Sequence, residues 1–324
     1  MSSDTQPSLA FGPVPSRRLG QSLGVNNIPP KHCSYACVYC QLGRTPRMLV
    51  TRASYLQPGE IRDAVRRRLE ECRRDRVRVD YLTVVPDGEP TLDAELGRLI
   101  AMLRELGTPV AVITNGSLID RDDVRRDIAL ANWVSVKVDA VDPAVWRRVN
   151  RPHGKLRLEA ILDGLRSFAA SFRGALVTET MLVAGVNDGE AEIEALAGFL
   201  SEIRPAIAYL AVPTRPPAES WVRPPDTVGL VRAYDTVARR LPRVELLVGD
   251  PIEAVASSSD VERDLLAITA VHPMDDTMVL ELGGGSRGAL AVAEELVADG
   301  KLAQVEYRGR RFFVRPFAGT RDRV

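Results

Sequence analysis

The chain has 324 residues, in which 43 basic and 43 acidic side chains cancel to a formal net charge of zero at neutral pH. A chain without net charge has no global field that attracts nucleic acid or an anionic membrane, so any such partner must be recognised by a local patch. Hydrophobic residues make up 45% of the sequence, which supports a substantial core, and the length allows two domains or one large barrel with an appendage. The first residues carry no signal-peptide pattern, and no apolar run reaches the roughly 18 residues of a membrane span. We therefore expect a cytoplasmic protein without a membrane partner.

Short apolar runs alternate with longer amphipathic segments over the first part of the chain. The runs are rich in Val, Ile, Leu and Thr and predict six strands, at residues 22–28, 79–85, 109–114, 133–138, 175–183 and 206–212. The amphipathic segments predict helices at residues 58–74, 92–106, 121–131, 156–172 and 190–203. Strands and helices that alternate in this way form a parallel sheet with helices outside it. We therefore predict an α/β fold whose functional groups collect where the strands end.

The rhythm of the sequence changes near residues 248–259, where Gly249-Asp250-Pro251 and a run of three serines interrupt the alternation. After this break the pattern predicts three helices and then two strands, at residues 260–270, 275–281, 286–298, 301–307 and 310–315. The dipeptide Arg308-Gly309 joins the two strands as a hairpin turn. Three helices followed by a hairpin indicate a winged helix-turn-helix module. We therefore predict two domains, residues 1–250 and residues 251–324.

Three of the four cysteines lie within the run Cys33-Ser34-Tyr35-Ala36-Cys37-Val38-Tyr39-Cys40. Three thiols this close together cannot all form disulfides with the one remaining cysteine, Cys72. A structural zinc site needs four ligands, and His32 directly precedes the first of these cysteines, which places it badly for a tetrahedron that includes all three thiols. Three thiolates around an iron–sulfur cluster leave one iron open for chemistry, so the spacing favours such a cluster.

The spacing of Cys33, Cys37 and Cys40, with the aromatic Tyr39 before the last cysteine, resembles the CxxxCxxC signature of radical S-adenosylmethionine (SAM) enzymes. The resemblance implies a [4Fe–4S] cluster whose open iron binds SAM, and reductive cleavage of SAM to a 5′-deoxyadenosyl radical that abstracts a hydrogen atom from a substrate. It also implies a partial (β/α)6 radical SAM barrel, with the cluster loop after the first strand, and an external electron donor such as flavodoxin or ferredoxin. Cys72 stands alone in a predicted helix and we interpret it as structural, so we expect a single cluster.

The segment after the second predicted strand, Pro86-Asp87-Gly88-Glu89-Pro90, resembles the family's GGEP motif, with Asp87 in place of the first glycine. By this resemblance Asp87, Gly88 and Glu89 bind the ammonium group of SAM, through backbone carbonyls and the acidic side chain. The ordinary interpretation is a strand-to-helix turn with a solvated Glu89.

Polar residues also end the next two strands. Asn115 follows the third strand, and Lys137 and Asp139 lie on one face at the end of the fourth. The resemblance places Asn115 near SAM, assigns Lys137 and Asp139 to its ribose and carboxylate, and includes Tyr39 in the same cofactor-binding set. The alternatives are a simple turn at Asn115 and an internal salt bridge at the lysine and aspartate.

Three further residues are candidates for binding the substrate. Glu179 stands between two threonines inside an apolar strand, where it either reaches the substrate or forms a helix-facing ion pair. Arg215 lies among three prolines, and a stiff loop at the open end of the barrel suits recognition of a carboxylate or a phosphate. We expect residues 13–20 either to cover the barrel mouth, with Arg17 or Arg18 reaching the substrate, or to form a solvated edge, which is the more ordinary interpretation.

Residues 11–20, 40–45 and 213–217 resemble a group of uncharacterised bacterial radical SAM proteins described as relatives of the wybutosine-synthesis enzymes. That resemblance assigns no substrate. The arginines of the predicted wing, Arg308, Arg310, Arg311 and Arg315, are suited to RNA, yet residues 257–324 carry nine Lys and Arg against eleven Asp and Glu.

The role of the C-terminal module thus stays open between RNA binding, peptide or protein binding, and a structural or small-molecule use. An alternative of another class is an iron–sulfur redox-sensing DNA-binding regulator. The SAM site that the resemblance implies argues against that alternative, because a sensor needs neither Glu89 nor a barrel.

Overall fold

The computed structural model describes residues 8–247, 261–269, 274–286, 288–307 and 309–314. Its main body is an eight-stranded sheet in which the strands lie side by side in chain order. The first pair is antiparallel, and every later neighbouring pair is parallel. The strands are β1 (Ala10–Ser16), β2 (Gly20–Val25), β3 (Tyr81–Val84), β4 (Val110–Thr114), β5 (Trp133–Lys137), β6 (Ala175–Met181), β7 (Ile207–Ala211) and β8 (Val244–Leu247).

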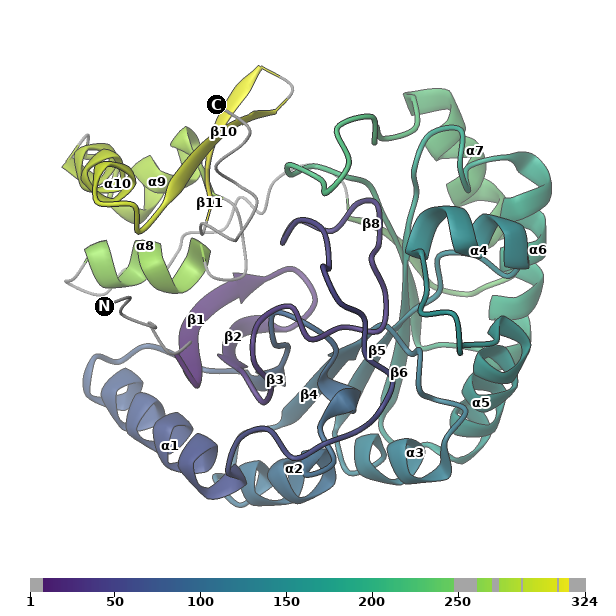
Figure 1. The fold of residues 1–324 in the computed structure, drawn as a ribbon, viewed down its shortest axis with the longest axis horizontal. Helices are drawn as coiled ribbons and strands as arrows, with labels where there is room; N and C mark the ends of the chain where they lie inside the picture. Colours follow the sequence, from purple (N-terminus) through teal and green to yellow (C-terminus); the bar gives the residue numbers. More distant parts are fainter. Residues whose placement is uncertain (1–7, 248–260, 270–273, 287, 308, 315–324) are drawn as a thin grey trace.

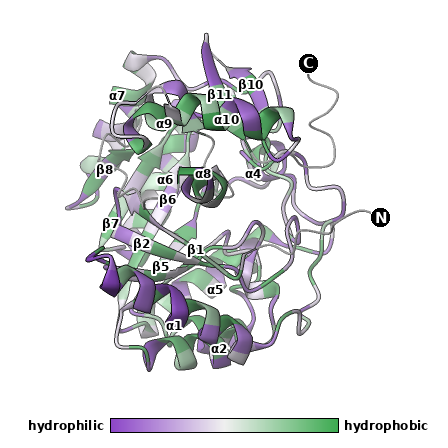
Figure 2. Ribbon diagram, turned by 90° about the vertical axis from the view of Figure 1, so that its left-hand side faces the viewer, coloured by the Kyte–Doolittle hydropathy of each residue, from purple (hydrophilic) through white to green (hydrophobic). Residues whose placement is uncertain are grey.

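Helices cover the outer side of this curved sheet and connect one parallel strand to the next (Figure 1). They are α1 (Pro58–Arg74), the 3₁₀ helix η1 (Pro90–Leu92), α2 (Leu96–Arg104), α3 (Asp122–Ile128), α4 (Pro143–Asn150), α5 (Leu158–Ser171), α6 (Glu190–Ile203) and α7 (Thr227–Ala238). Hydrophilic residues lie on the outer faces of α1 and α2 (Figure 2), as expected for amphipathic helices on a sheet. Among the residues that the structure describes, no helix is both long and apolar enough to cross a membrane.

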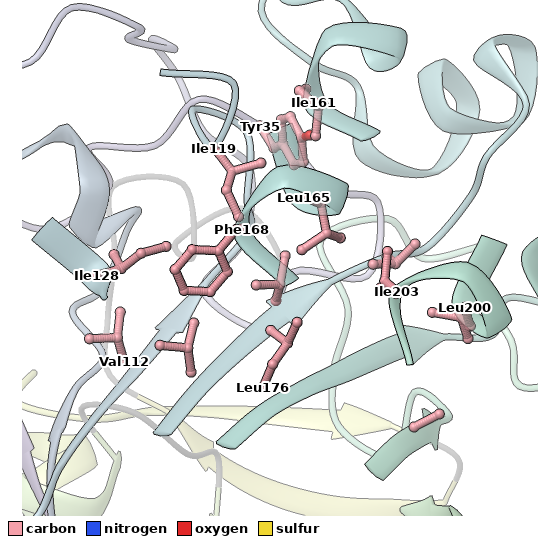
Figure 3. Close-up of a cluster of buried hydrophobic side chains, with 14 of the residues drawn as sticks. Tyr35, Val112, Ile119, Ile128, Ile161, Leu165, Phe168, Leu176, Leu200 and Ile203 are labelled. Carbon is pink, nitrogen blue, oxygen red and sulfur yellow. The ribbon is translucent and has the colours of Figure 1, made fainter. Parts of the chain in front are cut away.

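Successive side chains of each strand point to opposite faces of the sheet, so the sheet has two apolar clusters. On the outer face, Val112 and Leu176 pack with Phe168 of α5 (Figure 3). The inner face holds a smaller cluster around Leu19, which comes from the turn between β1 and β2. The other buried members of this inner cluster are Ala111, Trp133, Val177 and Tyr209.

The six predicted strands correspond to β2 through β7, and the structure adds a strand at each edge of the sheet. The predicted count of six is therefore too low. β1 escapes prediction because Pro13 and Pro15 interrupt its pattern; proline is tolerated there because an edge strand leaves one side of its backbone without ladder partners. The expectation that this segment covers the barrel mouth is wrong, because the turn after β1 lies at the amino-terminal end of β2, away from the cysteines.

The C-terminal residues form a second set of elements, α8 (Val261–Thr269), β9 (Met274–Asp275), α9 (Asp276–Leu282), α10 (Gly288–Ala298), β10 (Ala303–Tyr307) and β11 (Arg310–Val314). The three strands form an antiparallel sheet in the order β10-β11-β9. Their core includes Leu265, Val279 and Phe313 together with Val14 of β1, so this part of the chain packs against the first strand of the large sheet (Figure 1). The predicted helices and hairpin match these elements in position, apart from the additional β9. The predicted boundary between residues 250 and 251 lies outside the described residues.

Two helix glycines test how closely the outer layer packs. A Cβ at Gly164 of α5 would lie 2.5 Å from the Ile119 carbonyl oxygen and 2.6 Å from the Asp120 backbone, whereas a Cβ at Gly198 of α6 would meet only the Arg240 guanidinium, at 3.6 Å. Alanine in place of glycine inside a helix ordinarily stabilises it by about 0.5–1 kcal/mol. We expect Gly198→Ala to raise the free energy of unfolding by about that amount, and Gly164→Ala to lower it. Urea unfolding measures both, and a stabilised Gly164→Ala protein would contradict the backbone contact between α5 and the turn after β4.

Candidate functional site

The three clustered cysteines lie in a loop, residues 26–57, between the end of β2 and the start of α1. Because β2 to β8 are parallel, this cysteine loop begins at the same edge of the sheet as the loops that follow β3, β4 and β5. Cys33, Cys37 and Cys40 are partly exposed, whereas Cys72 is buried in α1. The loop contains no helix or strand of its own. Some of its backbone groups bond within the loop, such as the Cys40 N–H with the Cys37 carbonyl at 3.1 Å, and neighbouring elements must bond others.

Helix α4 anchors the middle of the cysteine loop. A helix leaves its last carbonyl groups without intrahelical partners. Here the carbonyl of Val149 accepts a hydrogen bond from the Val38 N–H at 3.0 Å, and the carbonyl of Asn150 accepts one from the Ala36 N–H at 3.1 Å. The C-terminus of α4 therefore fixes the backbone on both sides of Cys37.

The turn after β3 anchors the start of the same loop. The Asp87 carbonyl accepts a hydrogen bond from the Lys31 N–H at 2.7 Å, and the Glu89 N–H donates to the His32 carbonyl at 2.8 Å. Gly88 lies so close to the His32 carbonyl that a Cβ there would overlap with it. The structure thus places the predicted acidic turn directly against the residues that precede the first cysteine.

The Glu89 carboxylate is buried and accepts four hydrogen bonds. Its Oε1 accepts from the Thr91 N–H at 3.0 Å, the Thr91 hydroxyl at 2.6 Å and the Thr114 hydroxyl at 2.5 Å, and its Oε2 accepts from the Asn115 N–H at 2.7 Å. Burial raises the pKa of this carboxyl, although the bonds from Thr114 and Thr91 oppose the rise. The alternative of a solvated Glu89 is therefore wrong. Since a carboxylate oxygen accepts more than one hydrogen bond, Oε2 keeps the capacity for a further donor.

Two asparagine side chains from different elements approach the thiols. Asn115 lies after β4, with its Nδ2 at 3.5 Å from the Cys33 Sγ, and Asn150 ends α4, with its Nδ2 at 3.4 Å from the Cys37 Sγ. Burial is the main cause that raises the pKa of both thiols, that of Cys37 to about 12. Asn115 is a predicted site residue, but sequence reasoning missed Asn150, which belongs to no motif.

Tyr39, Lys137 and Asp139 are brought together beside Cys37. The Asp139 side chain is fully buried; its Oδ1 accepts the Met181 N–H at 2.8 Å, and its Oδ2 accepts the Tyr39 hydroxyl and the Asn150 Nδ2, the latter at 2.7 Å. Lys137 places its Nζ 3.9 Å from Asp139 Oδ1 and 4.8 Å from the centre of the Tyr39 ring. The long distance makes Asp139 a secondary partner of the lysine.

The main partner of Lys137 is Glu179, which lies opposite it in the register of β5 and β6. Lys137 Nζ is 2.8 Å from Glu179 Oε1, and Arg18 pairs with the other carboxylate oxygen. Burial raises the pKa of Glu179, but Arg18 and Lys137 outweigh it and hold the pKa at about 2. Glu179 therefore forms ion pairs, and they lie on the inner face with Val177 rather than against the helices.

Arg17 and Arg215 differ in their relation to the cysteines. Arg17 is exposed in the turn between β1 and β2, at the opposite edge of the sheet, so the structure does not bring it to the cysteine loop. Arg215 lies in the loop after β7 and donates from Nη1 to the Gln41 Oε1 at 3.3 Å, next to Cys40.

Sequence reasoning also missed Glu219, which joins the loop after β7 to the cysteine loop. Its carboxylate is 8% exposed and bonds Arg44 through two contacts of 2.9 Å each, and Arg151 at 2.6 Å. The two guanidinium groups remain partly exposed. Two positively charged side chains, Arg44 and Arg151, therefore surround the buried Glu219 carboxylate at the edge of the cysteine loop.

The sequence model of the radical SAM superfamily matches residues 27–197, just over half of the chain and the part that contains the cysteine loop and β3 to β6. The chain belongs to the radical SAM superfamily. This radical SAM enzyme is 42% identical over 310 residues to the UPF0026 protein MJ1312 of Methanocaldococcus jannaschii, which covers 95% of this chain and 96% of that relative. It is 33% identical over 213 residues to a UPF0026 protein of Helicobacter pylori strain 26695, covering 65% of this chain and 68% of the relative.

Solved structures share the fold of this radical SAM enzyme. TYW1 with a lysine-pyruvate adduct bound superposes with a TM-score of 0.53 at 18% identity, over 69% of this chain and 76% of that one. A radical SAM methyltransferase from Sphaerobacter thermophilus gives a TM-score of 0.52 at 18% identity, over 72% of this chain and 68% of that one. At these identities the likeness concerns the fold alone. The resemblance read from the cysteine spacing is confirmed by the family match.

Enzymes of this superfamily generally use a [4Fe–4S] cluster and SAM, and the residues of this radical SAM enzyme fit such a cluster. Burial disfavours the anionic thiolate of Cys33 and Cys37, and bound iron together with the two amide N–H donors would offset that cost. Three soft sulfur ligands on one loop are also the donor type that iron–sulfur clusters take. Within the described ranges, no three His, Cys, Asp or Glu side chains are arranged to hold a single metal ion; a [4Fe–4S] cluster does not require such an arrangement, because each cysteine binds a different iron.

The Glu179 ion pairs predict a pH-dependent stability. In the folded protein the pKa of Glu179 lies near 2, below its ordinary value of 4.5. The ion pairs therefore stabilise the fold in full above pH 4.5, and this stabilisation is lost as the pH falls toward 2. We expect Glu179→Gln to lower the free energy of unfolding by on the order of 3 kcal/mol at neutral pH, and the difference from wild type to shrink in acid. Urea unfolding across this pH range measures it, with Glu70→Gln on the exposed face of α1 as the control. A difference that does not change with pH would show that the ion pairs do not stabilise the fold.

Proposed function

We propose that Cys33, Cys37 and Cys40 hold one [4Fe–4S] cluster and that SAM binds beside it at the carboxyl-terminal edge of the sheet. Bound there, the two groups supply reductive cleavage of SAM to methionine and a 5′-deoxyadenosyl radical, which abstracts a hydrogen atom from the substrate. The observation that carries the proposal is the convergence of three partly exposed thiols with amide donors from β4 and α4.

The residues proposed to bind SAM surround the cysteine loop. Glu89 and Lys137 carry opposite charges, which match the ammonium and the carboxylate of the methionyl group. The free capacity of Glu89 Oε2 supports the first assignment, and the burial of Lys137 beside the thiol loop supports the second. The full proposed set is Tyr39, Asp87, Gly88, Glu89, Asn115, Lys137 and Asp139, in which the fully buried Asp139 acts through the residues that it bonds rather than by contact with SAM.

A single cluster needs an external electron donor, and we propose a flavodoxin or ferredoxin for this role. Cys72 supports the single cluster, because it lies 2% exposed on the face of α1 that packs against the sheet. Of the three proposed substrate-binding residues, Arg215 has the best support, since it contacts the segment that follows Cys40. Glu179 and Arg17 have less support for this role. Glu179 is held in ion pairs, and Arg17 lies at the edge of the sheet opposite the cysteine loop.

Replacing the cysteines tests the cluster directly. We expect anaerobically reconstituted wild type and Cys72→Ala to bind equal amounts of iron and sulfide and to cleave SAM when reduced with dithionite. The triple variant Cys33→Ala/Cys37→Ala/Cys40→Ala should lose the cluster and the cleavage, because it lacks every clustered soft ligand. Iron and sulfide analysis together with 5′-deoxyadenosine release measure both properties, and a triple variant that still assembles a cluster would contradict the ligand assignment.

We propose that the C-terminal elements form a winged-helix-like module that selects the substrate. Support comes from the chain order of its elements, α8, β9, α9, α10, β10 and β11, in which the last two strands form a hairpin. The described wing arginines are already paired, Arg310 with Asp275, and Arg311 with Asp276 at 2.7 Å and Glu294 at 2.8 Å. Arg308 and Arg315 lie outside the described residues. This pairing favours a peptide or protein over RNA as the substrate.

A nucleic-acid binding test separates these substrates. If the paired arginines do not contact RNA, then Arg310→Gln/Arg311→Gln should leave the affinity of the full chain for a single-stranded RNA almost unchanged, and that affinity should depend weakly on salt. The control is Arg239→Gln/Arg240→Gln in the turn after α7, where two arginines share Glu194. Fluorescence anisotropy measures the affinity; a steep salt dependence that the Arg310/Arg311 variant alone reduces would establish RNA binding at the wing instead.

A further inference from the structure

Two of the three clustered thiols receive a hydrogen bond from a side-chain amide. Asn115 donates to Cys33, with an N···S distance of 3.5 Å, and Asn150 donates to Cys37 at 3.4 Å. The donors come from opposite sides of the loop, one from the end of β4 and one from the end of α4. An amide side chain presents a donor at one end and an acceptor at the other, so these contacts require that each amide be held in one orientation.

The orientation of Asn150 is set by Asp139. An ionised carboxylate only accepts hydrogen bonds, and the Oδ2 of Asp139 lies 2.7 Å from the Nδ2 of Asn150. The amide must therefore turn its NH₂ group toward Asp139, and the second hydrogen of that group faces the Cys37 Sγ. The asparagine is 2% exposed, which removes water as a competing partner.

The orientation of Asn115 is set by the backbone. Its Oδ1 accepts the Ser117 N–H at 2.9 Å, and this fixes the opposite end of the amide as the donor. The Nδ2 then donates both to the Cys33 Sγ and to the Ser34 hydroxyl, the latter at 3.0 Å. Two unrelated anchors therefore produce the same result, an N–H group directed at a cysteine sulfur.

Asp139 has little capacity left for a bound cofactor. Its Oδ1 accepts the Met181 N–H, its Oδ2 accepts both Tyr39 and Asn150, and its side chain has no exposed surface. Lys137, at 3.9 Å, balances its charge. The contacts of Asp139 thus point inward to the amide beside Cys37 rather than outward to a ligand.

We propose that Asp139 is a positioning residue that directs the Asn150 amide at Cys37, and that the two N–H···S bonds from Asn150 and Asn115 raise the reduction potential of the cluster. This inference rests on the proposed function, which supplies the cluster. Reduction adds negative charge to the cluster and its sulfur ligands, and an N–H dipole directed at sulfur stabilises that charge. The effect is strong where neighbouring groups are buried and the local dielectric constant is low.

The first experiment compares reduction potentials. Asn150→Leu keeps the volume of the side chain and removes the donor, so we expect its cluster to have a reduction equilibrium about tenfold less favourable, a potential lower by ~59 mV for one electron. Asp139→Asn should lower the potential less than Asn150→Leu does, because the loss of the fixed Asn150 NH₂ group is opposed by the loss of a negative charge beside Cys37, which favours reduction. The control is Asn27→Leu, which also removes a fully buried asparagine but one that bonds Pro90 and Asp93 rather than a thiol. Redox titration followed by electron paramagnetic resonance measures all four proteins, and equal potentials in Asn150→Leu and Asn27→Leu would overturn the inference.

The second experiment uses the wild-type protein and does not depend on how a variant folds. Protein labelled with ¹⁵N in the asparagine side chains should show two weakly coupled amide nitrogens in hyperfine spectra of the reduced cluster, and Asn150→Leu, where it assembles, should show one. A wild-type cluster without coupled amide nitrogen would overturn this inference and leave the proposed function intact. A wild-type protein that assembles no cluster would refute the proposed function itself, and the inference with it.

Discussion

A loop without helix or strand can satisfy only part of its backbone by bonds within itself, and this constraint shapes the whole functional edge of the protein. Each buried N–H or carbonyl left without a partner costs about 1–3 kcal/mol. Besides bonds within the loop, its backbone finds partners in three other places: the turn after β3, the C-terminus of α4, and the loop after β7, where the Glu219 N–H donates to the Val38 carbonyl at 3.0 Å. The positions of the three thiols therefore depend on elements that are distant in the sequence and adjacent only because the strands are parallel.

Buried charge is the second constraint, and the inner face of the sheet meets it by pairing. Glu179 lies between Arg18 and Lys137, and Asp139 lies within reach of the same lysine, so two cations and two anions balance in the space beneath the cysteine loop. Such an arrangement is costly to break, since removing one partner leaves a buried charge without compensation. The ion pair between Arg18 and Glu179 also connects the turn after β1 to β6, and so links the opposite edge of the sheet to the site.

The sequence predicts those parts of the structure that local pattern determines. Alternating apolar runs identify β2 to β7, and the cysteine spacing identifies the loop, because both signals lie in neighbouring residues. β1 escapes because its prolines are acceptable only at an edge, a property of the assembled sheet. Asn150 and Glu219 escape because their roles arise from partners far away in the chain, at Cys37 and at Arg44 and Arg151. The motif identifies Glu89 as a site residue, but it does not predict the four hydrogen bonds that the carboxylate accepts from the protein.

The end of α4 shows how a short sequence feature determines the surroundings of a thiol. Pro152 disfavours the helical conformation at the residue before it, and Arg151 adopts a left-handed conformation, with φ of 44°, that ends the helix. This conformation costs a residue other than glycine roughly 1–2 kcal/mol, and the ion pair of Arg151 with the buried Glu219 offsets part of that cost. The helix must then end at Asn150, which frees its carbonyl for the cysteine loop and places its amide between Asp139 and Cys37. A helix longer by one turn would use the Asn150 carbonyl in an intrahelical hydrogen bond and leave it unable to bond the cysteine loop, so the end of the helix at Arg151-Pro152 is part of the site.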